Sequence, residues 1–181
     1  MNFKLIETQI NDVKIFQSDI FEDSRGYLIE SYKSDFFKQC LPSVNFVQDN
    51  ESESSYGVIR GLHYQKSPYE QSKLVRVIKG KVQDVAVDLR KDSTTYLQYV
   101  SVILSSDNRK QLYIPRGFAH GFLVLSSKAI VQYKMDGYFN QESYNGIKYD
   151  DPSIGIKWEL DSADITVSKK DSKLSYIKYT G

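Results

Sequence analysis

Residues 73–90 read KLVRVIKGKVQDVAVDLR, two runs of alternating apolar residues with a glycine between them. Valine stands at alternate positions 75 and 77, and again at 85 and 87, as in a β-strand with one buried face. Lys79-Gly80 predicts a tight hairpin that joins strands 73–80 and 81–90, because glycine readily adopts the positive φ of such turns. The stretch predicts β-structure.

Outward from this hairpin, short β-type runs recur at intervals of roughly ten residues, without long helical periods between them. We expect further strands at 13–21, 26–32, 45–52, 57–65, 98–106, 110–115, 120–127 and 129–139. Such spacing is typical of a β-sandwich or barrel. A short helix is predicted at 34–40, capped by Ser34 or Asp35, and a helical turn at 151–155. Because no repeat or linker divides residues 1–181, we expect a single all-β domain.

The composition excludes several classes of function. Lys plus Arg (24) nearly balance Asp plus Glu (23), so the charge gives no reason to expect binding to nucleic acid or to an anionic membrane. A local basic cluster would still suit a phosphorylated small molecule. The single cysteine, Cys40, excludes an internal disulfide and suits a reducing cytoplasm. Lys4 and Glu7 interrupt the first apolar run, and no run is long enough to span a bilayer.

The stretch RGLHYQ (60–65) puts an arginine and one of only two histidines inside a predicted strand. Strict alternation would point Arg60 and His63 to opposite faces of the strand. A β-bulge at Gly61 would bring both side chains to one face. From this stretch alone, a hydrogen-bonded histidine in a barrel wall and an arginine at its rim is the favoured interpretation.

The second histidine, His120, lies in IPRGFAHGFLVL (114–125), where a Pro-x-Gly turn leads into a strand. This spacing resembles the second signature of the cupin superfamily, which implies a jelly roll with short peripheral helices. Cupins usually supply a His-x-His pair earlier in the chain, but here the matching residues are His63 and Gln65. A metal site made of His63, Glu70 and His120 therefore stays a minor alternative. Without a metal, two imidazoles in one barrel are candidates for proton transfer.

Longer motifs carry a more specific resemblance, to the dTDP-4-dehydrorhamnose 3,5-epimerase family. They occur in order between about residues 10 and 172: FEDSRGYLIESY, FVQDNES, GVIRGLHYQ, KLVRVIKGKVQDVAVDLRKDS, RKQLYIPRGFAHGFLVLS, YKMDGYF and GIKYDDPSIGIKW. The resemblance implies a cytoplasmic isomerase that needs neither metal nor cofactor. Its members epimerise dTDP-4-keto-6-deoxy-D-glucose at C3 and C5, α to the C4 ketone, in the dTDP-rhamnose pathway that supplies surface polysaccharides.

The resemblance also implies roles for individual residues in the reaction. His63 would be the base that removes the α-proton, and Asp171 would pair with it and favour its protonated form. Lys73 would stabilise the enolate at the sugar O4, and His120 would contact the substrate near O4 and help to polarise the carbonyl. Tyr133 would return a proton from the opposite face of the sugar.

A further set of residues matches the family's substrate-binding positions: Arg25, Glu30, Gln48, Asn50, Arg60, Tyr138 and Lys170. The resemblance gives Arg60 and Arg25 to the diphosphate and sugar, which a guanidinium can grip through two oxygens. It gives Tyr138 an aromatic character suited to stacking on the base. Without the family, a surface ion pair would be the favoured interpretation of Arg25 and Glu30.

The match departs from the family pattern in NQESYNGIK (140–148). Glu142 is retained, but Tyr144 stands where a second acidic residue is common, and Phe139 replaces a common tyrosine. These changes leave open a C3-only epimerase of a related 4-keto nucleotide sugar. The density of His63, Lys73 and the other candidate residues argues against a non-catalytic sugar-binding cupin.

The resemblance implies a homodimer whose N-terminal strands pair across the interface. Segments 13–21 and 26–32 are apolar and β-prone, and would otherwise form exposed edges. In that arrangement Arg25 and Glu30 would act on the partner's pocket, whereas in a monomer they would cover their own barrel.

Overall fold

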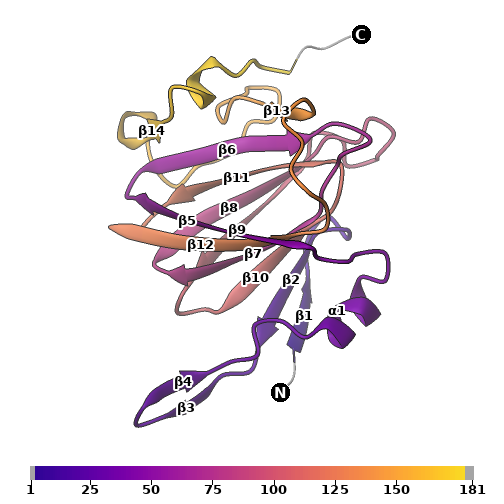
Figure 1. The fold of residues 1–181 in the computed structure, drawn as a ribbon. Coiled ribbons are helices and arrows are strands. Elements are labelled where there is room, and N and C mark those ends of the chain that lie inside the picture. Colours follow the sequence, from indigo (N-terminus) through magenta and orange to yellow (C-terminus); the bar gives the residue numbers. More distant parts are fainter. Residues whose placement is uncertain (1–2, 178–181) are drawn as a thin grey trace.

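Two antiparallel β-sheets face one another in the computed structural model, which describes residues 3–177 (Figure 1). The first sheet has the order β1-β2-β10-β7-β12-β5. Its strands are β1 (Phe3–Glu7), β2 (Lys14–Ser18), β10 (Lys110–Ile114), β7 (Lys73–Lys79), β12 (Lys128–Met135) and β5 (Gln48–Ser55).

The second sheet has the order β13-β6-β11-β8-β9, and β14 pairs in parallel with β6. Its strands are β13 (Tyr144–Gly146), β6 (Val58–Gln65), β11 (Phe118–Val124), β8 (Lys81–Asp88), β9 (Tyr99–Ser105) and β14 (Thr166–Val167). The two sheets form a jelly roll of the cupin type, so the predicted fold class is confirmed.

The hairpin expected at Lys79-Gly80 is wrong. β7 pairs with β10 and β12, whereas β8 pairs with β9 and β11, so the chain crosses from one sheet to the other at this glycine. Gly80 has φ +83°, and a Cβ there would collide with the Lys128 carbonyl oxygen. Positive φ was the correct inference, but it serves a corner between sheets rather than a turn within one.

The bulge considered at Gly61 is present. His120 of β11 lies opposite His63, yet Phe122, two residues further on, lies opposite Arg60, so three steps on β6 match two on β11. Gly61 has φ +127°, and a Cβ on it would lie 2.5 Å from Gly121 Cα. Only glycine fits this backbone, and the bulge brings Arg60 and His63 to one cavity.

The core between the sheets contains the inward-facing residues of both, among them Val75, Val77, Val82, Ala86, Phe118, Phe122, Val124 and Val131. The opposite face of the second sheet packs against the C-terminal segments, around Leu62, Val85 and Trp158. β8 is therefore covered on both faces, which explains why it is almost entirely buried.

Helix α1 (Ser34–Cys40) has the predicted bounds, but its cap was predicted wrongly. The N-cap residue is Lys33, and no side chain caps the helix. Phe37 attaches the helix to the first sheet, with its ring centroid 4.8 Å from that of Phe16. The helical turn expected at 151–155 is confirmed, and in it the Gly155 amide donates to the Asp151 carbonyl at 2.9 Å.

Two short 3-10 helices, η1 (Ser162–Asp164) and η2 (Asp171–Lys173), lie in the C-terminal region where no element was expected. No helix within residues 3–177 is long and apolar enough to cross a membrane.

The predicted strand at 26–32 is shorter in the structure, where β4 (Gly26–Leu28) pairs with β3 (Phe21–Asp23). This two-stranded ribbon extends away from the barrel (Figure 1). Its apolar side chains are exposed to solvent, by 50% for Phe21 and 61% for Leu28.

Candidate active site

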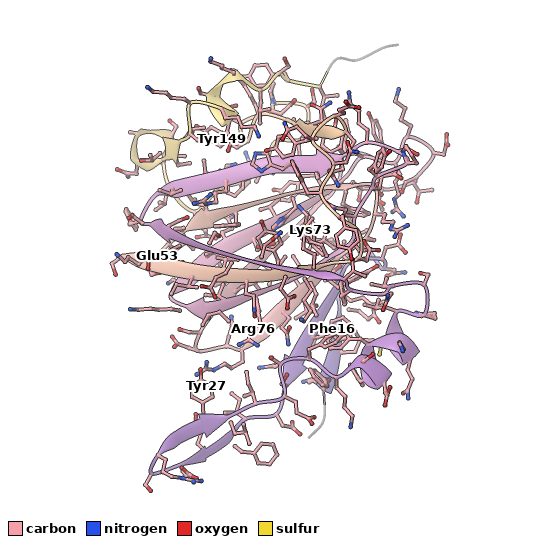
Figure 2. All side chains as sticks on the ribbon, viewed as in Figure 1. Phe16, Tyr27, Glu53, Lys73, Arg76 and Tyr149 are labelled. Carbon is pink, nitrogen blue, oxygen red and sulfur yellow. The ribbon has the colours of Figure 1, made fainter. Side chains whose placement is uncertain are left out.

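The candidate site is a hollow between the sheets where inward-facing residues change from apolar to polar. Along β7, Lys73 precedes the buried Val75, and along β12 Tyr133 follows the buried Val131. Two adjoining cavities of about 510 Å³ and 640 Å³ occupy this region. Both are lined by Ser52, Arg60, His63, Lys73, Tyr133 and Tyr144. Figure 2 shows Lys73 between the two sheets.

His63 and Asp171 form a close pair at the wall of the smaller cavity. His63 Nε2 lies 2.7 Å from Asp171 Oδ1. Asp171 begins η2, and its amide donates to Ser168 Oγ at 3.0 Å, which fixes the carboxylate. With Nε2 donating to this carboxylate, the other ring nitrogen carries the lone pair that a base needs.

Burial lowers the pKa of His63, and this effect exceeds the opposing influence of the hydrogen bond and negative charge of Asp171. The carboxylate therefore acts in the expected direction but does not dominate. At neutral pH the imidazole is mostly unprotonated, which is the state that can accept a proton.

Lys73 and His120 line the smaller cavity beside His63. Burial lowers the pKa of Lys73 to about 8, and the nearby Asp84 carboxylate opposes that shift. His120 Nε2 lies 3.0 and 3.1 Å from the two carboxylate oxygens of Asp84, which is fully buried. Asp84 thus orients the His120 ring and supports the charge of Lys73.

Tyr133 and His63 come from opposite sheets. Tyr133 is on β12 of the first sheet, His63 is on β6 of the second, and both line the two cavities. A sugar between them would have an imidazole on one side and a phenol on the other. Inversion of a carbon centre needs this arrangement, since the proton leaves one face and returns to the other.

The smaller cavity carries an excess of positive charge. Arg60, Lys73 and Lys170 line it against one carboxylate, Asp171. Arg60 donates through Nε to Ser54 Oγ at 2.8 Å and through Nη2 to the Glu53 carbonyl at 3.3 Å. Among residues 3–177 none of the three cations forms an ion pair with a carboxylate. Cations without a carboxylate partner that line a cavity favour an anionic ligand such as a diphosphate.

Gln48 and Asn50, two of the predicted substrate-binding residues, line the larger cavity. Gln48 donates to Asn50 Oδ1 at 3.0 Å, and Asn50 lies opposite Tyr133 in the pairing of β5 with β12. Their amides are therefore held next to the proposed acid.

Three predicted substrate contacts lie away from both cavities. Arg25 is on the β3–β4 ribbon, where its guanidinium pairs with Asp23 at 2.5 Å. Glu30 follows that ribbon and lines neither cavity. Tyr138 is 74% exposed, and the neighbouring Phe139 lines the larger cavity in its place.

Sequence reasoning missed Asp84 and the position of Tyr144. Asp84 stands between Val82 and Ala86 on the inward face of β8. A buried acid needs a partner, so an acid at this inward-facing position could have indicated a functional site. Tyr144 was noted only as a departure from the family, although it lines both cavities.

The residues of the alternative metal site do not fit a metal. The Nε2 atoms of His63 and His120 each lie against a carboxylate, and Glu70 lines neither cavity. Within residues 3–177 no three His, Cys, Asp or Glu side chains are grouped to hold an ion.

Gln65, which occupies the position of a cupin histidine, forms hydrogen bonds that hold neighbouring loops. Its Nε2 donates to the Tyr69 carbonyl at 3.0 Å. Its Oε1 accepts from the Asn140 amide at 2.7 Å and from Ser143 Oγ at 3.2 Å. The amide thereby ties the loop before β13 to β6.

Comparison with known proteins identifies the family. The model of the dTDP-4-dehydrorhamnose 3,5-epimerase family matches residues 7–178. The enzyme of that name from Escherichia coli K12 is 48% identical over 171 residues, 94% of this chain and 92% of its own. Its namesake from Methanothermobacter thermautotrophicus is 47% identical over 170 residues, 93% and 91% of the two chains.

Comparison with a solved structure supports the same family. The 3,5-epimerase RmlC of Legionella pneumophila Philadelphia 1, in complex with dTDP-4-keto-L-rhamnose, superposes with a TM-score of 0.93. It is 45% identical, and the match covers 97% of this chain and 93% of that one. This chain therefore belongs to the dTDP-4-dehydrorhamnose 3,5-epimerase family.

Proposed function

We propose that this protein epimerises dTDP-4-dehydro-6-deoxy-D-glucose at C3 and C5, giving dTDP-4-dehydro-L-rhamnose. One observation carries the proposal: His63, held by Asp171, and Tyr133 come from opposite sheets and line the same cavities. The C4 ketone acidifies the protons on both neighbouring carbons, so one base and one acid serve two inversions.

His63 removes the proton from each α-carbon. One ring nitrogen is fixed by Asp171 at 2.7 Å, and the other accepts the proton. The imidazolium that forms is stabilised by the Asp171 charge, which makes the transfer less unfavourable inside a buried site.

Lys73 stabilises the enolate oxygen that develops at C4. With a pKa of about 8, its side chain is mostly an ammonium ion at neutral pH and donates a hydrogen bond to that oxygen. His120, oriented by Asp84, adds a second polar group on the same side.

Tyr133 then gives a proton to the opposite face of the carbon, which completes the inversion. Arg60 and Lys170 bind the diphosphate, because the cavity charge is positive and neither side chain has a carboxylate partner in the described chain. Gln48 and Asn50 bind the nucleotide end from the larger cavity. A cytoplasmic site of action suits the single cysteine and the nucleotide-sugar substrate.

We further propose a homodimer in which the β3–β4 ribbon lies against the partner. The ribbon exposes Phe21, Tyr27 and Leu28, and such apolar surface is usually covered by a partner. β5 is the last strand of its sheet in the described residues and offers an unpaired edge. In this dimer Arg25 and Glu30 reach the partner's cavity.

Incubation with dTDP-4-keto-6-deoxy-D-glucose in deuterated water tests the proposal. Proton NMR and mass spectrometry should find deuterium at both C3 and C5, and a reductase should trap the L-lyxo product. Deuterium at C3 alone would establish the C3-only epimerase instead. Absence of exchange at both carbons, with the nucleotide sugar bound, would contradict both assignments.

A further inference from the structure

Tyr144 lies where the two cavities meet, and its ring is in contact with a cation. β13 places it opposite Gln65 in the pairing with β6. Lys170 Nζ lies 3.7 Å from the centroid of the Tyr144 ring. The ring also lies 5.3 Å from His63 and 5.7 Å from Phe139, measured between centroids. An aromatic face at this distance attracts an ammonium ion.

The Lys170 ammonium lies over the ring of Tyr144. Within residues 3–177 Lys170 forms no ion pair, although Asp171 is the next residue in the chain. The Asp171 carboxylate points instead to His63, at 2.7 Å. Lys170 is therefore held at the cavity wall while its positive charge stays uncompensated.

The phenol group of Tyr144 adds no negative charge to the cavity. Burial raises the pKa of Tyr144 to about 12, and the nearby charge of Asp171 contributes in the same direction. The side chain is thus neutral at any pH at which the protein works. A glutamate at this position would carry a charge within reach of Lys170 and would neutralise it.

We propose that Tyr144 is a positioning residue that strengthens the site's affinity for a diphosphate: its ring holds Lys170 against the cavity without neutralising it. The inference rests on the proposed function and deepens it by assigning one source of the affinity for the diphosphate. It predicts that position 144 acts on binding through Lys170, more than through its own contact with ligand.

Calorimetric titration with dTDP measures this coupling without any turnover. Tyr144→Leu should weaken the dTDP affinity about 3–10-fold, since it removes the π face but keeps an apolar side chain. Tyr144→Phe retains the ring and should recover most of that loss. In a Lys170→Met background, Tyr144→Leu should change the affinity by less than about twofold, because the cation is absent.

Tyr144→Glu and Tyr144→Gln separate charge from size. The glutamate variant should bind dTDP at least about tenfold more weakly than the glutamine variant at low salt, and the difference should shrink as salt is added. Tyr176→Leu is the matched control, because Lys148 Nζ lies 4.8 Å over the Tyr176 ring outside both cavities. Circular dichroism and thermal melting would confirm that each variant is folded.

Equal losses from Tyr144→Leu with and without Lys170 would overturn the inference, as would full dTDP affinity in Tyr144→Leu. If the parent protein is folded and exchanges deuterium but its variants give either of these results, only the inference is contradicted. If the parent protein does not bind dTDP at all, both the inference and the proposed function are contradicted.

Discussion

The His63 imidazole and the Asp171 carboxylate meet at 2.7 Å although 108 positions separate them in the sequence. The carboxylate arrives on the C-terminal segment, whose strand β14 runs parallel to β6 and so follows the strand that carries His63. Further along, the Ile177 amide donates to Asp151 Oδ2 at 2.6 Å and secures the segment. The contact between His63 and Asp171 therefore depends on docking of the chain's last described residues.

Replacement of Asp171 by asparagine keeps the side-chain shape but removes the charge. We expect kcat to fall roughly 10²-fold with little change in KM, because the imidazolium formed in the reaction loses its counter-charge. In the parent protein the pKa of His63 lies below its usual 6.5. As pH rises through that pKa the imidazole loses its proton, so kcat/KM should rise and then level off below pH 6.5. In Asp171→Asn this acid limb should move further down. An unchanged limb would show that Asp171 does not act on His63.

Lys73 should set the alkaline limit of activity. Its ammonium is the form that stabilises an enolate, and its pKa is about 8. As pH rises through this value the charge is lost, so kcat/KM should fall above pH 8. Lys73→Arg keeps the charge at alkaline pH and should remove this limb while lowering the maximum. Profiles measured from pH 5 to 10 on both proteins test the assignment, and a limb that persists in the arginine variant contradicts it.

Gly61 and Gly26 allow backbone strain to be separated from crowding. Both have φ +127°, but a Cβ on Gly61 would lie 2.5 Å from Gly121 Cα, whereas one on Gly26 meets nothing within 4 Å. Gly26→Ala should therefore lower the free energy of unfolding by about 1 kcal/mol, from φ strain alone. Gly61→Ala should cost a further ~1–3 kcal/mol from overpacking. Urea titration compares the two, and equal losses would exclude the crowding.

The sequence predicted most of the barrel, because alternation is a local property of each strand. It did not predict which strands pair. The hairpin at Gly80 was wrong, since a glycine with positive φ serves a turn within a sheet and a corner between sheets equally well. β1, β13 and β14 were missed, and the predicted strand 13–21 reaches β3 only at Phe21. β13 and β14 are only 3 and 2 residues long and are defined by their pairing with β6.

For the candidate site, too, the residues could be predicted from the sequence but their arrangement in space could not. Family motifs led to His63, Lys73, Tyr133 and Asp171, and the structure brings all four to one cavity. Their closeness could not be derived from spacing, because it depends on the jelly-roll crossover and on the docked C-terminal segment. Tyr138 was chosen for its aromatic ring, but an exposed loop position depends on local backbone direction, and it faces solvent.

Leu28 offers a direct test of the proposed dimer. It is 61% exposed on the β3–β4 ribbon, so a charge there costs the isolated subunit little but would be buried against a partner. Leu28→Glu should shift the protein from dimer to monomer in light scattering, without loss of the β-sheet signal in circular dichroism. A parent protein that is monomeric at working concentration would remove the dimer proposal.

Complementation between two inactive chains decides whether Arg25 acts on its own cavity or on the partner's. Arg25→Ala should lower activity roughly tenfold or more by removing a charged contact to the substrate, and His63→Ala should abolish it. The two chains are co-expressed with different affinity tags, and the mixed dimer is isolated through both. If Arg25 acts in trans, the cavity that retains His63 receives Arg25 from the His63→Ala partner. About half of the parent activity then returns, because one of the two sites is complete.

If Arg25 acts in cis, each cavity of the mixed dimer still lacks one essential residue, and activity stays at the level of the separate variants. The present geometry favours the first result, because Arg25 lies on a ribbon that extends away from its own barrel (Figure 1).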